Sequence, residues 1–225
     1  MSSADTQTLE DDLAQAREAL LHAGDALRSH YKNTERQAYS DARANVKRLE
    51  RELGHAKGEE VAIPYPWSPI WNGGAPEPHI VASGHRVYLL YYVHTPDPDW
   101  DGTYVNVIDS SSPAAMPLAI VEVERCYSHR FGGPNGEVFH GHPLGERGLD
   151  GYGVYVVEGS KWIAEHRATN SVHSMYDESA WEKPKHFFFA FHDNVFECIA
   201  QGFNVETVQM TFADALTMLA GRVVS

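Results

Sequence analysis

Leucine and alanine recur with helical spacing along the first sixty residues of the chain. Two series of these residues, each with steps of three and four positions, would form narrow apolar stripes along helices. The first series is Leu9, Leu13, Ala16, Leu20, Ala23 and Leu27, and the second is Ala38, Ala42, Val46, Leu49, Leu53 and Ala56. The pattern predicts a helical arm over residues 1–57, with helix from about residue 7.

The two stripes are offset by one residue, which leaves two arrangements of the arm open. Thr34-Glu-Arg-Gln37 has the form of a capping box, in which both end residues satisfy free amides at the start of a second helix. We therefore expect an antiparallel helical hairpin that turns near residues 30–33. The alternative is one long helix with a phase slip that forms a coiled coil with another chain. In either case the stripe needs a partner surface, and we expect homo-oligomerisation through this arm.

Prolines and glycines interrupt the helical pattern over residues 58–78 and predict a linker. Trp67, Ile70 and Trp71 lie in this stretch, and we expect them to pack against the domain that follows. The alternative is that these side chains form an exposed strip that binds a partner.

Short segments rich in β-branched and aromatic residues follow, with turn-forming residues between them. The predicted strands are residues 86–93, 104–108, 118–124, 152–157, 187–191, 195–200 and 203–208. The fifth and sixth flank His192-Asp-Asn194 and predict a hairpin. Ser160 begins one predicted helix, and Thr211 begins a last helix that we expect to end at Gly221. The pattern indicates an α+β fold, in which a mostly antiparallel sheet domain (79–225) follows a helical hairpin or coiled-coil arm and ends in a C-terminal helix.

The composition and net charge of the chain bear on which kinds of molecule it can bind. The 225-residue chain has a formal net charge of −13, and an acidic surface repels phosphate backbones and anionic headgroups. We therefore expect neither nucleic-acid nor membrane partners. The chain has only two cysteines, begins without a signal-peptide pattern and has no apolar run long enough to span a bilayer. These features predict a cytoplasmic protein.

Histidines are concentrated in one part of the chain, with ten of the thirteen between His79 and His192. Histidine is the side chain that titrates near neutral pH and a common metal ligand, so chemistry is expected there. Residues 127–151 form a glycine-rich stretch without periodic pattern, which predicts an ordered functional loop. We expect a small polar molecule to bind between this loop and the hairpin at 186–197. If the protein is an enzyme, the reaction of that molecule would take place at the same site. The reaction type, and whether the protein is an enzyme, stay open.

Side-chain chemistry suggests roles within this site. His192 would act as a base or hydrogen-bond donor, supported by Asp193 or Glu197. Two arginines offer the fixed fork of donors that holds an anionic group. The predicted substrate-binding residues are His129, Arg130, Arg147 and His186. The alternative is structural: Asp193 and Asn194 form a turn pair, and His192 bonds locally.

His140, His142 and Glu146 form a second group of candidates. Histidines two positions apart on an extended segment point to one face, so two imidazoles and a carboxylate could meet a divalent metal ion. The spacing resembles the first cupin motif, in which two histidines and a glutamate bind such ions. In this chain Gly133 lies seven residues before His140 rather than six, and the Pro-x-Gly of the second cupin motif is missing. The resemblance implies a divalent-metal enzyme as an alternative function.

Three motifs resemble those of a family of uncharacterised bacterial proteins. They are His129-Arg-Phe-Gly132, Gly141-His-Pro-Leu144 with Arg147-Gly-Leu149, and the segment from His186 to Ala200. The resemblance covers residues 125–202 and leaves the helical arm outside. It implies no established activity, so a further alternative is an interaction protein that dimerises or binds a partner through the arm.

Overall fold

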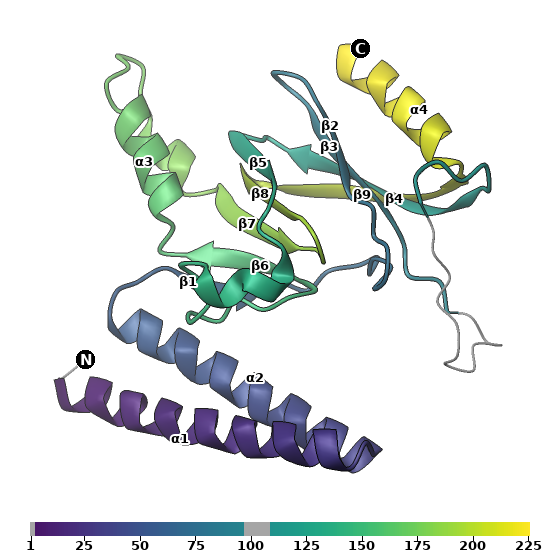
Figure 1. The fold of residues 1–225 in the computed structure, drawn as a ribbon. Coiled ribbons are helices and arrows are strands. Elements are labelled where there is room, and N and C mark those ends of the chain that lie inside the picture. The colour runs from purple at the N-terminus through teal and green to yellow at the C-terminus, as the bar shows by residue number, and fades with distance from the viewer. Residues whose placement is uncertain (1–2, 97–108) are drawn as a thin grey trace. The chain divides into compact units, whose positions relative to one another are not determined.

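The computed structural model describes residues 3–96 and 109–225 and confirms the α+β class (Figure 1). The fold consists of an N-terminal pair of helices, antiparallel sheets and a C-terminal helix. The strand predicted at 104–108 lies outside the described residues. No helix within the described ranges has both the length and the apolar character that crossing a membrane requires.

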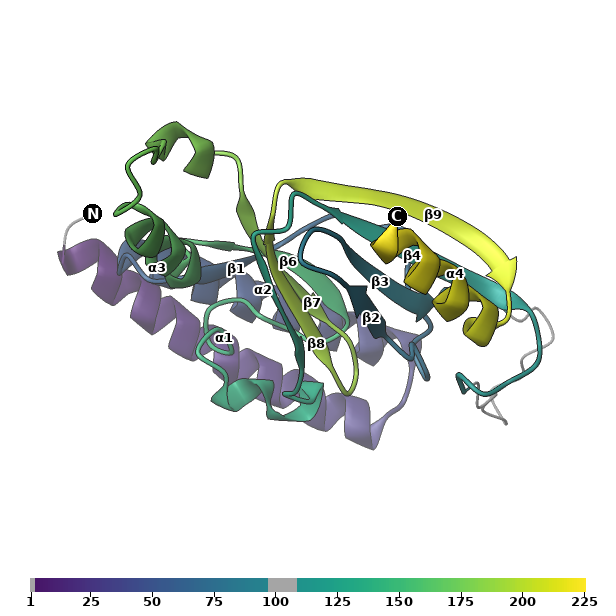
Figure 2. The same cartoon turned by 90° about the horizontal axis from the view of Figure 1, so that it is seen from above.

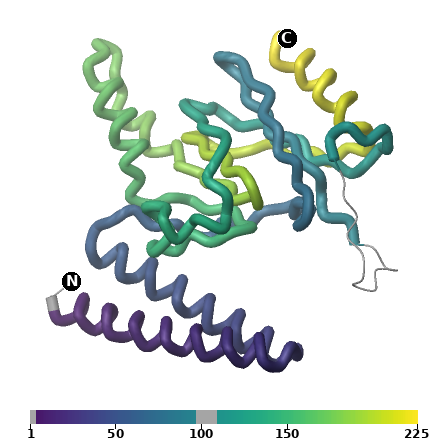
Figure 3. The backbone as a smooth tube through the Cα atoms, viewed as in Figure 1, coloured from purple at the N-terminus to yellow at the C-terminus, as the bar shows by residue number. Residues whose placement is uncertain are grey.

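Helices α1 (Ser3–Ser29) and α2 (Asn33–Ala56) run side by side and form the predicted hairpin, which excludes the single long helix (Figure 3). Their apolar stripes face each other, with Leu13 and Ala16 of α1 buried against Val46 and Leu49 of α2. Each stripe therefore finds a partner surface within the hairpin itself. Oligomerisation through the arm stays a prediction, but burial of these stripes does not require it.

The capping box predicted at the start of α2 is wrong. Lys32 occupies the N-cap position and makes no side-chain capping bond. The Thr34 hydroxyl donates to the Glu35 carboxylate, and the Gln37 amide donates to Asp41 one turn later. Because the helix already begins at Asn33, Thr34 lies past the position from which a side chain can cap the first turn.

The chain divides into two compact units. The first contains the chain up to Ile63 with residues 138–150 and 157–161, and the second contains residues 64–137, 151–156 and 162–225. The sequence had predicted one domain over 79–225, whereas residues 138–150 belong with the helices. Side chains of α2 hold this segment: Lys47 donates to the Gly145 carbonyl, and Arg43 pairs with Asp150. These contacts join residues 98 and 107 positions apart, so no local pattern reveals them.

A five-stranded sheet has the order β1-β6-β7-β8-β5. Its strands are β1 (Val61–Pro64), β5 (Ser128–Gly132), β6 (Gly153–Glu158), β7 (Lys185–Ala190) and β8 (Val195–Ala200). Strands β7 and β8 form the predicted hairpin, whereas β1 lies within the stretch predicted as a linker. The prediction of a loop over 127–151 is also wrong for two parts of that range, which form β5 and the 3-10 helix η1 (Gly136–Gly141). Backbone pairing with β8 orders β5, and this long-range contact has no local sequence signal.

The second sheet has the order β2-β3-β4-β9 and is antiparallel throughout. Its strands are β2 (His79–Ala82), β3 (Val87–Tyr92), β4 (Met116–Glu124) and β9 (Gly202–Met210). Helix α4 (Phe212–Val224) packs along one side of this sheet through Phe212 and Leu219 (Figure 2). The predicted start of α4 is confirmed, because the Thr211 hydroxyl accepts a hydrogen bond from the Asp214 amide at 3.1 Å. The predicted end at Gly221 is wrong, because the helix continues to Val224. The remaining helices are α3 (Lys161–Asn170) and the 3-10 helix η2 (Glu178–Trp181).

An aromatic core lies on the other side of this sheet, against β7 and β8. Trp71 is buried there, with its ring centre 4.5 Å from that of Phe191, and the Trp67 indole donates to the Tyr91 hydroxyl at 2.9 Å. The prediction that these two tryptophans pack against the following domain is confirmed, so they do not form a partner-binding strip. The same prediction is wrong for Ile70, because 67% of the surface of this residue is exposed to solvent.

Candidate functional site

The β7–β8 turn holds two of the predicted catalytic residues. His192 Nδ1 lies 2.9 Å from Asp193 Oδ1, and the Asn135 side-chain amide donates to the same oxygen at 2.9 Å. The Gly136 amide donates to the His192 carbonyl at 2.8 Å. Partial burial, and then the Asp193 carboxylate, raise the pKa of Tyr152, whose ring centre lies 5.7 Å from that of His192. The Asp193 carboxylate can orient the His192 imidazole. The bonds donated by the Asn135 side chain and the Gly136 amide hold the turn against residues 135–136.

Glu197, the third predicted catalytic residue, does not join this turn. Its Oε2 lies 2.9 Å from Nε2 of His186. The hairpin register sets Glu197 opposite Phe188 and His186 opposite Ile199, so the two side chains are diagonal neighbours on one face of the sheet. The structure therefore brings Glu197 to His186 rather than to His192. The two side chains are only 12% and 5% exposed, which makes them a shielded histidine–carboxylate pair.

Arg130 reaches the neighbourhood of this pair from β5. It lies directly opposite Glu197 in the β5–β8 register, and its guanidinium lies over the Trp162 indole, 4.0 Å from the ring centre. The Trp162 ring centre is in turn 5.1 Å from that of His186. We call Arg130, Trp162, His186 and Glu197 the β5–β8 cluster. Sequence reasoning missed Trp162, because in the sequence it is an ordinary apolar position of a helix.

His129 does not belong to this cluster, although it precedes Arg130 in the chain. Its register partner is Cys198, and its ring centre lies 6.4 Å from that of Phe196 in the aromatic core. Successive residues of a strand project to opposite faces. The structure therefore does not bring His129 and Arg130 together, although both were predicted to bind one substrate.

The first unit contains a pocket of about 530 Å³ between α1, α2 and residues 140–147. Four residues predicted from the sequence line it: His140, His142, Glu146 and Arg147. The helices contribute carboxylates and cations to the same walls. The pocket is therefore predominantly polar and carries side chains of both charges.

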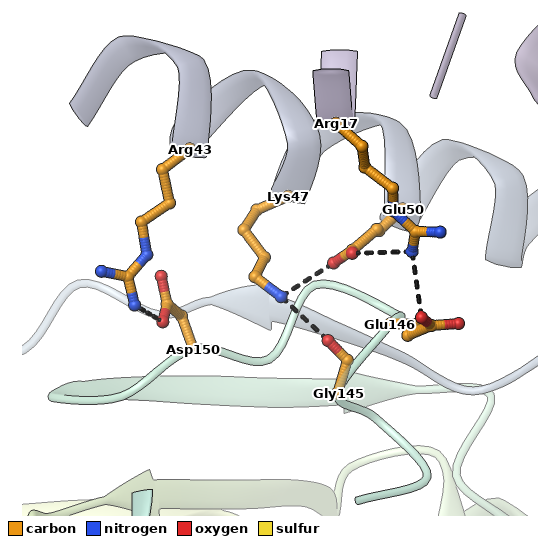
Figure 4. A network of polar contacts seen from close by, with 7 residues as sticks. All are labelled: Arg17, Arg43, Lys47, Glu50, Gly145, Glu146 and Asp150. Atoms are coloured by element: carbon orange, nitrogen blue, oxygen red, sulfur yellow. Dashed lines mark hydrogen bonds and ion pairs between the residues drawn. The ribbon is translucent and has the colours of Figure 1, made fainter. Parts of the chain in front are cut away.

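Three residues that line this pocket, Arg17, Glu50 and Glu146, belong to an ion network (Figure 4). Arg17 Nη2 lies 3.3 Å from carboxylate oxygens of both Glu50 and Glu146. Lys47 Nζ lies 2.9 Å from Glu50 and donates to the Gly145 carbonyl at 2.8 Å. Glu50 is buried, so its two cationic partners offset the cost of removing its charge from water.

Two more ion pairs lie along the pocket. Lys57 pairs with Glu10 at 2.7 Å, and Arg147 pairs with Glu59 at 2.9 Å. Arg147, predicted to hold an anionic group, is thus already matched by a carboxylate within the first unit. His140 is exposed and makes no hydrogen bond or ion pair with any residue in the described ranges.

The three predicted metal ligands do not form a metal site in this arrangement. No group of three histidine, cysteine, aspartate or glutamate side chains suited to an ion occurs in residues 3–96 and 109–225. The Leu144 amide donates to Nδ1 of His142 at 3.1 Å, which places the proton of a neutral ring on Nε2. Glu146 faces Arg17 instead of a shared centre with His140. The divalent-metal function therefore receives no support from these side chains.

The fold and these groups define an α+β protein with a polar pocket in one unit and a histidine–carboxylate cluster in the other. Comparison of the chain with protein-family models, curated proteins and solved structures finds no match. The resemblance to uncharacterised bacterial proteins stays a prediction.

Proposed function

We propose that the protein binds a small polar molecule in the pocket of its first unit. The observation that carries this proposal is the pocket itself, because a volume of about 530 Å³ lies in the range typical of small-ligand sites. Four residues singled out from the sequence line it, among them His140 and His142. Their chemistry suits hydrogen bonding to a polar ligand.

The charges of the lining favour a ligand that carries both an anionic and a cationic group. Carboxylates and cations alternate along the walls as matched pairs. A ligand with one sign of charge would be repelled by half of these groups, whereas a zwitterion can bind both members of a pair. The Arg17–Glu146 pair is the most exposed of these pairs, with side chains that are 42% and 73% exposed. We therefore expect molecules of the amino-acid type.

Ligand-observed NMR with single amino acids as probes tests this proposal. Acetate and ethylamine serve as probes with one charged group, and we expect them to bind more weakly than the zwitterions. Arg17→Gln should weaken amino-acid binding about tenfold or more, as loss of one charge-assisted hydrogen bond implies.

Arg43→Gln is the matched control for this substitution. Both arginines join the helices to residues 138–150 through an ion pair, but only Arg17 lines the pocket. Binding should survive Arg43→Gln. Absence of binding by every amino-acid probe, or equal losses in the two variants, would contradict the proposal.

A second candidate function, acid–base chemistry on an anionic molecule, rests on the β5–β8 cluster. Within the described residues no carboxylate lies at ion-pair distance from Arg130, and Trp162 holds its guanidinium in place. A fork of donors held in this way is ready to receive a carboxylate or phosphate group. The shielded Glu197 would orient the His186 imidazole for proton transfer.

Thermal stabilisation by inorganic phosphate, a simple anionic probe, tests this second candidate. Arg130→Lys keeps the charge and removes the fork, so it should abolish the stabilisation. The matched control is Arg125→Lys, at an exposed arginine outside the cluster. Equal stabilisation of the two variants would count against an anion site at Arg130.

A further inference from the structure

The edge strands of the two sheets differ in how they are protected. Strands β1 and β5 form the edges of one sheet, and β2 and β9 form the edges of the other. Strand β1 has four residues and ends in Pro64, β2 has four residues, and the five-residue β5 carries Arg130. Short length, proline and charge are usual means of preventing edge-to-edge pairing. Strand β9 has nine residues and is the long edge.

Strand β9 is also regular and open. It pairs with β4 through nine consecutive residue pairs, without a bulge. Residues 202–210 contain no proline or lysine and one charged residue, Glu206. The four residues at the middle of the strand, 204–207, are exposed. Among residues 3–96 and 109–225, no strand pairs with its outer side (Figure 2).

We propose that a second copy of this chain pairs with β9, antiparallel about a twofold axis, so that two four-stranded sheets become one of eight strands. Residues directly opposite in such a pair share a face of the sheet. The register with Val205 opposite its own copy sets Asn204 opposite Glu206 and keeps the two Glu206 carboxylates apart. A register centred on Glu206 would place like charges directly opposite each other, which is unfavourable.

The neighbouring surface suits this partner. Glu206 forms an ion pair with Arg222 of α4, so the strand brings no unpaired carboxylate to the contact. A hollow of about 300 Å³ lies over β4 and β9 beside α4, so the Asn204 and Glu206 side of the edge strand is open to a partner. It is lined by Ile120, Glu122, Asn204, Val205, Glu206 and Arg222. Because each copy has a net charge of −13, salt should strengthen the dimer by screening their repulsion.

Sedimentation equilibrium of the full chain tests the proposal. We expect a dimer that tightens with salt and that Val205→Lys converts to a monomer, since two lysines would then lie opposite each other on the axis. The matched control is Leu21→Lys on α1, where the leucine is 69% exposed and the dimer should persist. A wild-type monomer at every concentration and salt level would overturn the proposal, as would a dimer that Leu21→Lys dissociates and Val205→Lys does not.

A cross-link provides a test that does not depend on the lysine variant folding. Val205→Cys places two thiols opposite each other on the axis, at a separation that a disulfide can bridge. Mild oxidation should produce a covalent dimer from Val205→Cys and none from Leu21→Cys or the wild-type chain, whose Cys198 is buried and Cys126 partly buried. Failure of Val205→Cys to cross-link where the wild-type chain is dimeric would also overturn the proposal. The pocket of the first unit takes no part in either experiment.

Discussion

His186 and Glu197 bind each other across the β7–β8 hairpin, with Nε2 and Oε2 2.9 Å apart. In the sequence, His192 is the nearer histidine to Glu197, and it has Asp193 beside it. The strand register decides otherwise, because it places positions 186 and 197 on the same face of adjacent strands. His192 pairs instead with its own neighbour at the turn.

Removal of the Glu197 carboxylate should cost more stability than removal of the Asp193 carboxylate. Glu197→Ala removes the carboxylate at Nε2 of the buried His186, and we expect the free energy of unfolding to fall by about 2–3 kcal/mol. Asp193→Ala removes a histidine contact of the same length, but its carboxylate is 66% exposed, so the loss should be at most about 1 kcal/mol. Urea unfolding followed by circular dichroism measures both. Equal losses would show that His186 finds another acceptor.

The buried Glu50 should stabilise the helical unit strongly. Glu50→Gln removes the charge that Arg17 and Lys47 share, while Arg17 keeps Glu146 and Lys47 keeps the Gly145 carbonyl. Weakening two hydrogen bonds to a buried charged group should cost about 2 kcal/mol. The control is Glu52→Gln on the same helix, whose exposed ion pair with Arg48 should contribute less than about 1 kcal/mol. Thermal melts of the two variants give the comparison. A mild effect of Glu50→Gln would indicate that water reaches this wall of the pocket.

A glycine is required at position 148. Its φ is +92°, and an added Cβ would lie 2.4 Å from Arg51 Cγ and 2.8 Å from the Ala62 carbonyl oxygen. Gly148→Ala should therefore lower the free energy of unfolding by more than about 1 kcal/mol. Gly141→Ala, where an added Cβ meets no atom within 4 Å, is the matched control and should change stability little. Chemical unfolding of both variants checks this, and similar stabilities would mean that residues 147–149 can shift without cost.

The thiol of Cys126 should react slowly at neutral pH. Burial raises its pKa to about 11, and this effect exceeds the opposing effect of a backbone hydrogen bond with Ser128. The thiolate is the reactive form, so the alkylation rate should rise about tenfold for each pH unit between 8 and 10. In urea-unfolded chain the same thiol should follow an ordinary cysteine, with a rate that levels off above about pH 9. A plateau at that pH in the folded protein would show that Cys126 is solvated.

The sequence by itself determined the elements whose signals are local. The three- and four-residue spacing of leucine and alanine predicted the helical arm, and Thr211 predicted the start of the last helix, because helix periodicity and capping involve residues within one or two turns. The aromatic and β-branched segments on either side of His192-Asp-Asn194 likewise predicted the β7–β8 hairpin, whose strands are joined by a short turn. Within the candidate site, the sequence indicated the pairing of His192 with Asp193, but not that of Glu197 with His186 or of Arg130 with Trp162.

Only the tertiary structure decided which of these residues meet. Glu197 binds His186, and Arg130 separates from His129, because strand register and side-chain alternation assign each position to a face. Trp162 enters the cluster from a helix. The segment at 138–150 joins the helical arm through contacts such as Lys47 with Gly145, 98 positions away. Pairing over such distances depends on the free energy of the whole packed unit, which no short window of sequence contains.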